Sequence, residues 1–160
     1  MEERIRKRKI VLVGTGFVGM SFAYSLLSEK GINELVLIDM NKDKAVGEQM
    51  DLSDGLPYAD SKMTIKAGEY EECGDADIVV ITAGAAQKPG QTRLELVGIN
   101  ARITKDVATQ VKNSGFKGIL VVASNPVDIM TYVAYKASGL PKEHVIGSGT
   151  ILDTARLRYN

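Results

Sequence analysis

A glycine-rich turn near the start of the chain constrains its fold more than any other feature. The apolar run Ile10-Val-Leu-Val13 leads into Gly14-Thr-Gly16-Phe-Val-Gly19, and a segment with helical spacing follows. In a strand–turn–helix unit, the first glycine permits the tight turn, the second lets a pyrophosphate approach the backbone, and the third lets the helix pack on the sheet. The free N–H groups of the first helical turn, which begins at Phe17 and Val18, then face the phosphates. The pattern predicts a dinucleotide site.

An acidic residue lies where the ribose of such a nucleotide is expected. Asp39 follows a second apolar run, Leu35-Val-Leu-Ile38, and comes twenty residues after Gly19. A carboxylate at this strand end accepts hydrogen bonds from the adenosine ribose and repels a 2′-phosphate, so NAD is favoured over NADP. The alternative is that the glycines only punctuate a turn, because the motif alone is a weak signal. The strand before it, the helix after it and Asp39 favour the nucleotide.

The rest of the chain alternates between strand and helix patterns. Runs rich in Val and Ile predict six parallel strands, at 9–13, 34–38, 62–67, 77–82, 118–123 and 144–146. Helical spacing lies between them, at 17–30, 41–55, 93–114 and 126–138, and again at 151–160. Because the strands are hydrophobic almost throughout, both faces of the sheet should be covered. We therefore expect an α/β Rossmann fold, a doubly wound parallel six-stranded sheet with helices on both faces.

Glycine and proline positions predict where these helices end and begin. Gly31, Gly115 and Gly139 each lie where a helix is expected to stop. Pro126 is expected in a first helical turn, where its missing N–H costs little.

Composition narrows the classes of partner and location. Twenty basic and twenty acidic residues cancel, which argues against nucleic acid as the main partner, and we interpret the basic cluster Arg4–Lys9 as a solvated N-terminal extension. No apolar segment precedes Ile10, and no apolar run reaches the roughly 18 residues that span a membrane, so a cytoplasmic location is expected. Cys73 has no Cys or His nearby in sequence for a metal site, and we interpret it as a structural thiol.

Two further loops are expected to meet the glycine turn where the strand order of the sheet reverses. The first begins with the small residues Thr82-Ala-Gly84, which suit close contact with a cofactor, and runs on to Arg93 as a segment long enough for a mobile lid. Arg93 would move inward as the lid closes, or is instead a solvated residue at a helix start. The second loop is Ser124-Asn-Pro126, where the amide of Asn125 binds a ligand or instead caps the next helix.

Together these segments resemble the L-lactate dehydrogenase/malate dehydrogenase family, in order along almost the whole chain. The resemblance rests on Gly14–Gly19, Asp39, Ala83–Arg93, Asn100, Ser124–Val127 and Gly147–Arg156. It implies a nicotinamide-binding Rossmann domain over residues 1–148, and the start of a C-terminal catalytic domain at 149–160. The implied cofactor is NAD, held by Gly14, Gly16, Phe17, Val18, Gly19, Asp39, Thr82, Ala83, Gly84, Asn100, Ser124 and Asn125.

The resemblance also implies substrate roles. Arg93 would polarise the keto oxygen, Asn125 would bind it, and the paired donors of Arg156 would grip the substrate carboxylate. Asp153 would orient and stabilise a catalytic histidine. Gln87 stands where the malate branch usually carries an arginine for a second carboxylate, so pyruvate and the bacterial lactate branch are favoured.

Partners and activity follow from the same resemblance. Arg158 matches a position that helps to bind the activator fructose 1,6-bisphosphate, and full-length relatives form tetramers in which the helix at 41–55 pairs with a copy of itself. The proton-donating histidine of the family lies in a Gly-Glu-His-Gly-Asp-like motif, which these 160 residues lack. We interpret the only histidine, His144 at the start of the sixth strand, as structural or superficial.

We therefore expect a domain that binds NAD(H) weakly and has negligible lactate dehydrogenase activity by itself, because general acid–base catalysis contributes about 10²–10⁴-fold. The alternatives are a malate or other 2-hydroxy-acid dehydrogenase domain, and a non-catalytic nucleotide-binding module.

Overall fold

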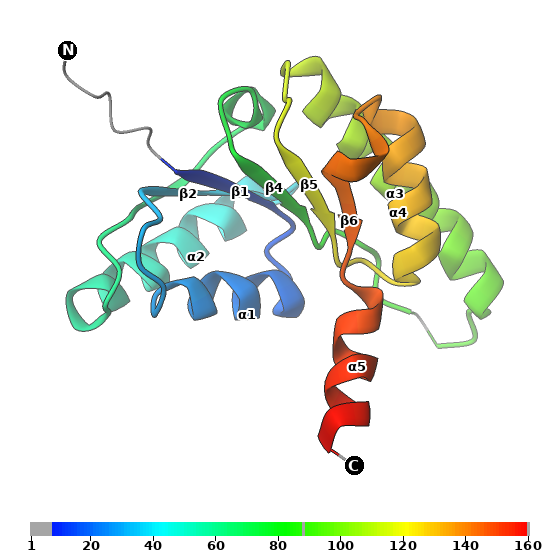
Figure 1. Ribbon diagram of the computed structural model, residues 1–160, viewed down its shortest axis with the longest axis horizontal. Coiled ribbons are helices and arrows are strands. Elements are labelled where there is room, and N and C mark those ends of the chain that lie inside the picture. The colour runs from blue at the N-terminus through cyan, green and yellow to red at the C-terminus, as the bar shows by residue number, and fades with distance from the viewer. Residues whose placement is uncertain (1–7, 88, 160) are drawn as a thin grey trace.

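A parallel six-stranded sheet forms the centre of the computed structural model, which describes residues 8–87 and 89–159 (Figure 1). Its strands are β1 (Lys9–Val13), β2 (Glu34–Ile38), β3 (Thr64–Ala67), β4 (Ile78–Ile81), β5 (Ile119–Val122) and β6 (Val145–Gly147). Their order across the sheet is β3-β2-β1-β4-β5-β6, and all neighbouring pairs are parallel. The strand order therefore reverses between β1 and β4, which confirms the doubly wound Rossmann fold.

Helices cover both faces of the sheet, as predicted. Helices α1 (Phe17–Leu26) and α2 (Lys42–Gly55) lie on one face, and α3 (Arg93–Asn113) and α4 (Val127–Ser138) lie on the other (Figure 1). Successive strand residues point to opposite faces, so the strands contribute to two cores. The core under α1 and α2 includes Leu12, Leu37, Ala23, Leu26 and Leu52. The core under α3 and α4 includes Val11, Ile81, Val107, Val111 and Met130.

Short-range signals explain several helix ends. Asn41 caps α2, and its Oδ1 accepts a hydrogen bond from the Lys44 N–H at 3.1 Å. Thr92 and Glu95 form a capping box at the start of α3, where the Glu95 carboxylate accepts from the Thr92 N–H at 2.9 Å. Gly139 ends α4 in the left-handed region, with φ 67°, which confirms the predicted stop.

Other predicted ends are wrong. Helix α1 stops at Leu26 instead of residue 30, because the next hydrogen bonds tighten to the i→i−3 pattern, as from the Ser28 N–H to the Ser25 carbonyl at 3.3 Å. Gly31 consequently serves the turn into β2. Pro126 lies at the N-cap of α4, before its first turn, because its backbone is extended, with ψ 123°.

The last helix, α5 (Gly149–Tyr159), begins two residues earlier than predicted. It extends away from the sheet and its helices (Figure 1), and residues 151–159 are all exposed.

Lys9 contradicts the prediction of a solvated N-terminal extension. It is the first residue of β1 and only 5% exposed, and its Nζ lies 2.6 Å from carboxylate oxygens of both Glu72 and Asp75. Burial disfavours its charged form, but the hydrogen bonds and charges of Asp75 and Glu72 raise the pKa of Lys9 above its ordinary value. Arg8 is exposed, whereas residues 4–7 of the basic cluster lie outside the described part of the chain. Burial of a lysine at this position thus depends on paired charges.

Cys73 and His144 occupy structural positions. The Cys73 side chain is fully buried, and burial raises the pKa of its thiol to about 12, so it stays protonated at neutral pH. His144 is half-buried in a 3₁₀ turn (Lys142–His144), with its Nδ1 3.2 Å from the Lys117 carbonyl oxygen. Strand β6 therefore starts at Val145, one residue later than predicted.

Candidate functional site

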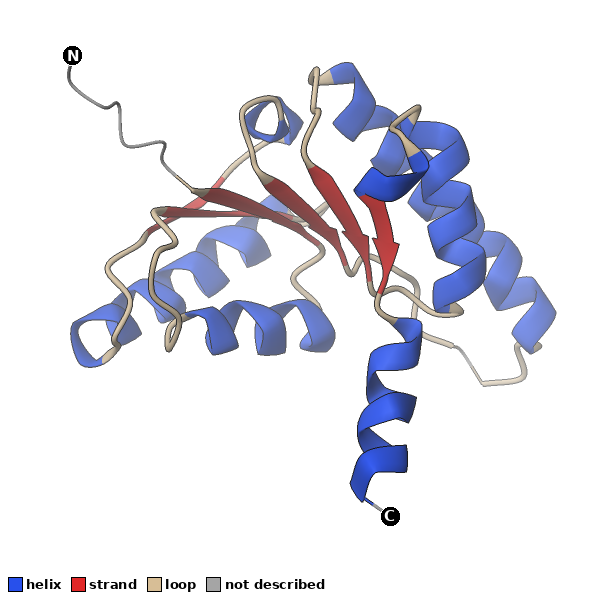
Figure 2. Cartoon of the chain, in the orientation of Figure 1, coloured by secondary structure: helices blue, strands red, loops and turns tan. Residues whose placement is uncertain are grey.

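The loops that follow β1 and β4 meet where the strand order reverses, as the sequence predicts. Because all neighbouring strands are parallel, their carboxyl ends lie at the same edge of the sheet, and helix α1 follows β1 at that edge (Figure 2). The Gly14 N–H donates to the Ile38 carbonyl at 2.8 Å, and the Thr82 N–H donates to the Val13 carbonyl at 2.9 Å. Three chain segments are thereby fixed side by side at the position where ligands bind in open parallel sheets.

The three glycines of the turn have different surroundings. Gly14 has φ 104°, and a Cβ there would lie 2.6 Å from the Ala83 nitrogen. A Cβ at Gly19 would collide with the Gly14 carbonyl oxygen and lie 2.7 Å from Thr82 Oγ1. A Cβ at Gly16 would meet nothing within 4 Å. The fold therefore requires Gly14 and Gly19, whereas the space at Gly16 is open to a ligand.

Helix α1 presents an uncapped first turn to this open space. Gly16 is its N-cap, and no side chain caps it. Phe17 and Val18 follow with 98% and 58% of their surfaces exposed. The free N–H groups and the positive end of the helix dipole suit an anion such as a pyrophosphate.

Asp39 is held at the end of β2 by three hydrogen bonds. Its Oδ2 accepts from the Thr15 N–H at 2.8 Å and from the Thr15 hydroxyl at 2.9 Å, and its Oδ1 accepts from the Asn41 N–H at 2.9 Å. Burial would raise the pKa of Asp39, but these three hydrogen bonds and the charge of Lys44 lower it below the ordinary value. A fixed, ionised carboxylate therefore lies next to the glycine turn, as an adenosine ribose requires.

Three neighbours of Asp39 were not predicted from the sequence. Besides Thr15, they are Lys44, whose charge favours the Asp39 carboxylate, and Tyr70, which lies in a 3₁₀ turn (Tyr70–Cys73). Burial raises the pKa of Tyr70 to about 12, and the negative charge of Asp39 adds to the effect. Only the fold brings Thr15 and Tyr70 near Asp39, whereas Lys44 follows Asp39 closely in the sequence, in the first turn of α2.

Buried and half-buried polar side chains fasten the neighbouring loops. Thr82 Oγ1 donates to the Gly14 carbonyl at 2.8 Å, and Ser124 Oγ donates to the Ala83 carbonyl at 2.7 Å. Asn100 of α3 is 4% exposed; its Oδ1 accepts from the Ala85 N–H at 2.8 Å and its Nδ2 donates to the Asn125 carbonyl at 3.1 Å. The structure thus joins the loops after β4 and β5 through side chains that the motifs single out.

Gly84 lies against Asn100, since a Cβ added there would be 3.5 Å from Asn100 Oδ1. The side chain of Asn125 is exposed and does not cap α4, so the capping alternative is wrong.

The predicted substrate residues are spread over three segments. Gln87 is exposed and donates from Nε2 to the Gln91 carbonyl at 2.8 Å. Arg93 is exposed as the first residue of α3. On the projecting helix α5, Arg156 Nη1 lies 3.6 Å from Asp153 Oδ1, and both side chains are exposed. Arg156 and Asp153 therefore contact each other, and the structure places neither against the glycine turn.

Arg158, the predicted activator contact, is also exposed on α5.

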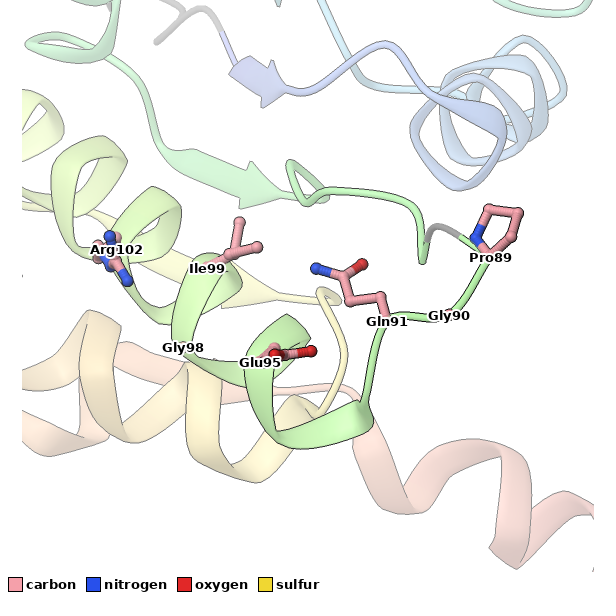
Figure 3. A pocket seen from close by; sticks show the side chains of 7 residues that line it. All are labelled: Pro89, Gly90, Gln91, Glu95, Gly98, Ile99 and Arg102. Carbon is pink, nitrogen blue, oxygen red and sulfur yellow. The ribbon is translucent and has the colours of Figure 1, made fainter.

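An open pocket of about 610 Å³ lies between the loop after β4 and helix α3 (Figure 3). Its lining consists of Pro89, Gly90, Gln91, Glu95, Gly98, Ile99 and Arg102. None of the predicted site residues contributes to it, so this pocket is distinct from the space at Gly16. Its walls come from residues 89–91 and from the first turns of α3.

The described residues show neither a metal-binding cluster nor a membrane-spanning helix. In segments 8–87 and 89–159, no three His, Cys, Asp or Glu side chains gather closely enough to hold a metal ion. No helix in those segments has the length and apolar character needed to cross a membrane.

Comparisons with known proteins agree with this geometry. A family model for the lactate/malate dehydrogenase NAD binding domain matches residues 8–147. An L-lactate dehydrogenase of Lactococcus lactis subsp. cremoris is 57% identical over 155 residues, which cover 97% of this chain and 49% of that protein. An L-lactate dehydrogenase of Macrococcus caseolyticus is 54% identical over 157 residues, which cover 98% of this chain and 50% of that protein.

Solved structures extend the similarity to the fold. A minor L-lactate dehydrogenase from Enterococcus mundtii, in its ligands-bound form, aligns with a TM-score of 0.92 and 55% identity over 96% of this chain and 49% of that one. A lactate dehydrogenase from a deep-sea metagenome library of the Medee basin aligns with a TM-score of 0.91 and 59% identity over the same shares. The chain thus spans about half the length of the relatives it matches.

Proposed function

Because this chain belongs to the lactate/malate dehydrogenase family and contains its NAD-binding domain, we propose that it forms the cofactor half of an L-lactate dehydrogenase. The complete enzyme would interconvert (S)-lactate and pyruvate with NAD and NADH. One observation carries the proposal: an ionised, hydrogen-bonded Asp39 stands beside an open glycine turn at the point of strand reversal.

The residues around that point fit a nicotinamide dinucleotide. The pyrophosphate would lie against Gly16 and the free N–H groups at Phe17 and Val18, and the adenosine ribose would bind Asp39. We assign the remaining contacts to Gly14, Gly19, Thr82, Ala83, Gly84, Asn100, Ser124 and Asn125. When bound, the cofactor supplies the hydride, and the protein supplies binding and orientation.

Substrate recognition would use the loop after β4 and helix α5. Arg93 would polarise the keto oxygen, Asn125 would bind it, and Arg156 would pair with the carboxylate after giving up its contact with Asp153. Asp153 would then orient the acid–base histidine. The loop that runs from Thr82 to Arg93 would move as a lid over the bound substrate.

Gln87 supports pyruvate as the substrate. Oxaloacetate carries a second carboxylate, which a neutral amide cannot balance, whereas pyruvate has a methyl group there. The test is to compare kcat/KM for pyruvate and oxaloacetate in a longer protein that carries this chain and a Gly-Glu-His-Gly-Asp-like motif. We expect pyruvate to be preferred and Gln87→Arg to move the preference toward oxaloacetate. A wild-type preference for oxaloacetate would instead support a malate dehydrogenase.

Residues 1–148 would form the NAD-binding domain, and 149–160 would open the catalytic domain. The 160 residues contain no Gly-Glu-His-Gly-Asp-like motif. We therefore expect them to reduce pyruvate negligibly on their own, because the proton donor is worth about 10²–10⁴-fold in rate. Robust turnover by the pure 160-residue chain would refute this expectation.

The proposed enzyme is cytoplasmic and self-associates as a tetramer. Helix α2 has exposed apolar side chains at Val46 and Met50, which support pairing with a second copy. Arg158, exposed on α5, would help to bind fructose 1,6-bisphosphate as an activator. Analytical ultracentrifugation of the longer protein, with and without fructose 1,6-bisphosphate, tests whether it forms a tetramer and whether the activator affects that assembly.

A further inference from the structure

Thr15 has a side-chain hydroxyl that the glycine turn itself does not need. The residue lies between Gly14 and Gly16 and is only 1% exposed. The turn itself depends on the glycines. The buried space at Thr15 could be filled equally well by a side chain of the same shape without a hydroxyl. The Thr15 hydroxyl and the Thr15 N–H nevertheless both donate to Asp39 Oδ2, at 2.9 and 2.8 Å. The Thr15 side chain thus adds a second hydrogen bond to Oδ2 of Asp39, the residue that we propose binds the ribose.

The hydrogen bonds on Asp39 are divided unequally between its two oxygens. A carboxylate has about four acceptor positions, two on each oxygen. Thr15 occupies two positions on Oδ2, and the Asn41 N–H occupies one on Oδ1. Because Thr15 is buried, the side of Oδ2 that faces it is closed to a ligand. The position left for a ribose hydroxyl is therefore on Oδ1.

We propose that Thr15 is a positioning residue for nucleotide binding, whose hydroxyl locks the Asp39 carboxylate with Oδ1 directed to the adenosine ribose. This inference rests on the proposed function, in which Asp39 binds that ribose. Without the hydroxyl, Asp39 keeps one N–H donor on each oxygen, and its carboxylate is less constrained. Binding must then order the side chain, and ordering a side chain on binding lowers affinity by about three- to tenfold.

The burial of Thr15 decides the direction of the effect. Removing the hydroxyl does free an acceptor position on Oδ2, and an exposed position would offer the ribose a new contact. This one faces the protein interior, so the nucleotide gains nothing from it. The loss of orientation therefore dominates, and affinity falls.

The test uses the 160-residue chain and five variants, four at Thr15 and Thr104 and one at Asp39. Thr15→Val removes the hydroxyl at nearly constant shape, Thr15→Ser keeps it, and Thr15→Ala removes it even if valine does not fit. The matched control is Thr104→Val, because Thr104 is also fully buried and, among the described residues, its hydroxyl donates a hydrogen bond only to the sulfur of Met130, at 3.3 Å. Each protein is titrated with NADH by fluorescence, and the pKa of Asp39 is measured by carbon NMR without nucleotide.

We expect Thr15→Val and Thr15→Ala to raise the pKa of Asp39 and to weaken NADH binding about three- to tenfold. Thr15→Ser should stay near the wild type in both measurements, and Thr104→Val should change neither. Unchanged NADH affinity in Thr15→Val and Thr15→Ala overturns the proposal, and so does an unchanged Asp39 pKa. A loss in Thr15→Ser as large as in Thr15→Val also overturns it, because the hydroxyl would then not be the cause.

The variant Asp39→Asn distinguishes a failure of the positioning role of Thr15 from a failure of the proposed ribose-binding role of Asp39. If Asp39→Asn weakens NADH binding and Thr15→Val does not, only the positioning role of Thr15 fails. If neither change weakens binding, the ribose role of Asp39 fails as well.

Discussion

Replacing Gly16 with alanine should weaken NADH binding and leave the fold almost unchanged. An added Cβ meets nothing within 4 Å, and the residue has φ −75°, which alanine adopts freely. Alanine is a poorer N-cap than glycine, which destabilises the fold. It also lowers the conformational entropy of the unfolded chain, which stabilises the fold by about 0.4–1 kcal/mol. These two effects oppose each other, so the free energy of unfolding should stay within about 1 kcal/mol of the wild type.

The effect on binding is larger because the methyl group occupies the proposed phosphate position. Displacing the pyrophosphate from the first turn of α1 costs at least one hydrogen bond to a charged group, about 1.5–3 kcal/mol. That loss corresponds to a roughly 10- to 100-fold increase in the Kd for NADH. Fluorescence titration measures the Kd, and urea unfolding followed by circular dichroism measures the stability.

Gly19→Ala provides the contrasting control. Its Cβ collides with the Gly14 carbonyl oxygen and lies 2.7 Å from Thr82 Oγ1, so the turn or α1 must shift. Overpacking of this kind costs about 1–3 kcal/mol or more, and stability should fall together with binding. If Gly16→Ala binds NADH as tightly as the wild type, the open space at Gly16 is not the phosphate site and the reasoning fails.

Two further predictions concern charged residues. Lys9→Met should lower the free energy of unfolding by about 1–3 kcal/mol at neutral pH, less than for a fully buried pair because Asp75 is exposed to solvent. Since the pKa values of Glu72 and Asp75 are lowered by Lys9, their contribution is present above the ordinary values of 4.5 and 3.8 and is lost as pH falls below them. Urea unfolding at a series of pH values should therefore show the difference between wild type and variant shrinking in acid, and a constant difference would contradict the pairing. Asp39→Ser should narrow the preference for NADH over NADPH in parallel titrations, and equal discrimination before and after the change would remove Asp39 from the ribose site.

The sequence predicts the parts of this fold that depend on local pattern. Runs of Val and Ile correctly predict the six strands. Gly139 predicts the end of α4, and helical spacing predicts the start of α3 at Arg93. The end of α1 does not follow the sequence pattern, because hydrogen bonds of the i→i−3 type replace the helical ones after Leu26.

Only the site residues that belong to sequence motifs could be predicted. Residues of the glycine turn and Asp39 are close in the fold because successive parallel strands bring their ends together. Thr15 and Lys44, which stabilise the Asp39 carboxylate, follow no periodic pattern. Lys9 pairs with carboxylates 63 and 66 residues away, so its burial depends on contacts that only the folded chain reveals.

A parallel titration of the purified 160-residue chain with NADH and NADPH tests the central claim most directly. Three features of the proposed site lie within this chain: the ionised carboxylate of Asp39, the uncapped start of helix α1 at Phe17, and the open space at Gly16. We predict saturable binding that prefers NADH over NADPH. Absence of NADH binding in a chain that circular dichroism shows to be folded, or equal affinity for the two nucleotides, would contradict the account.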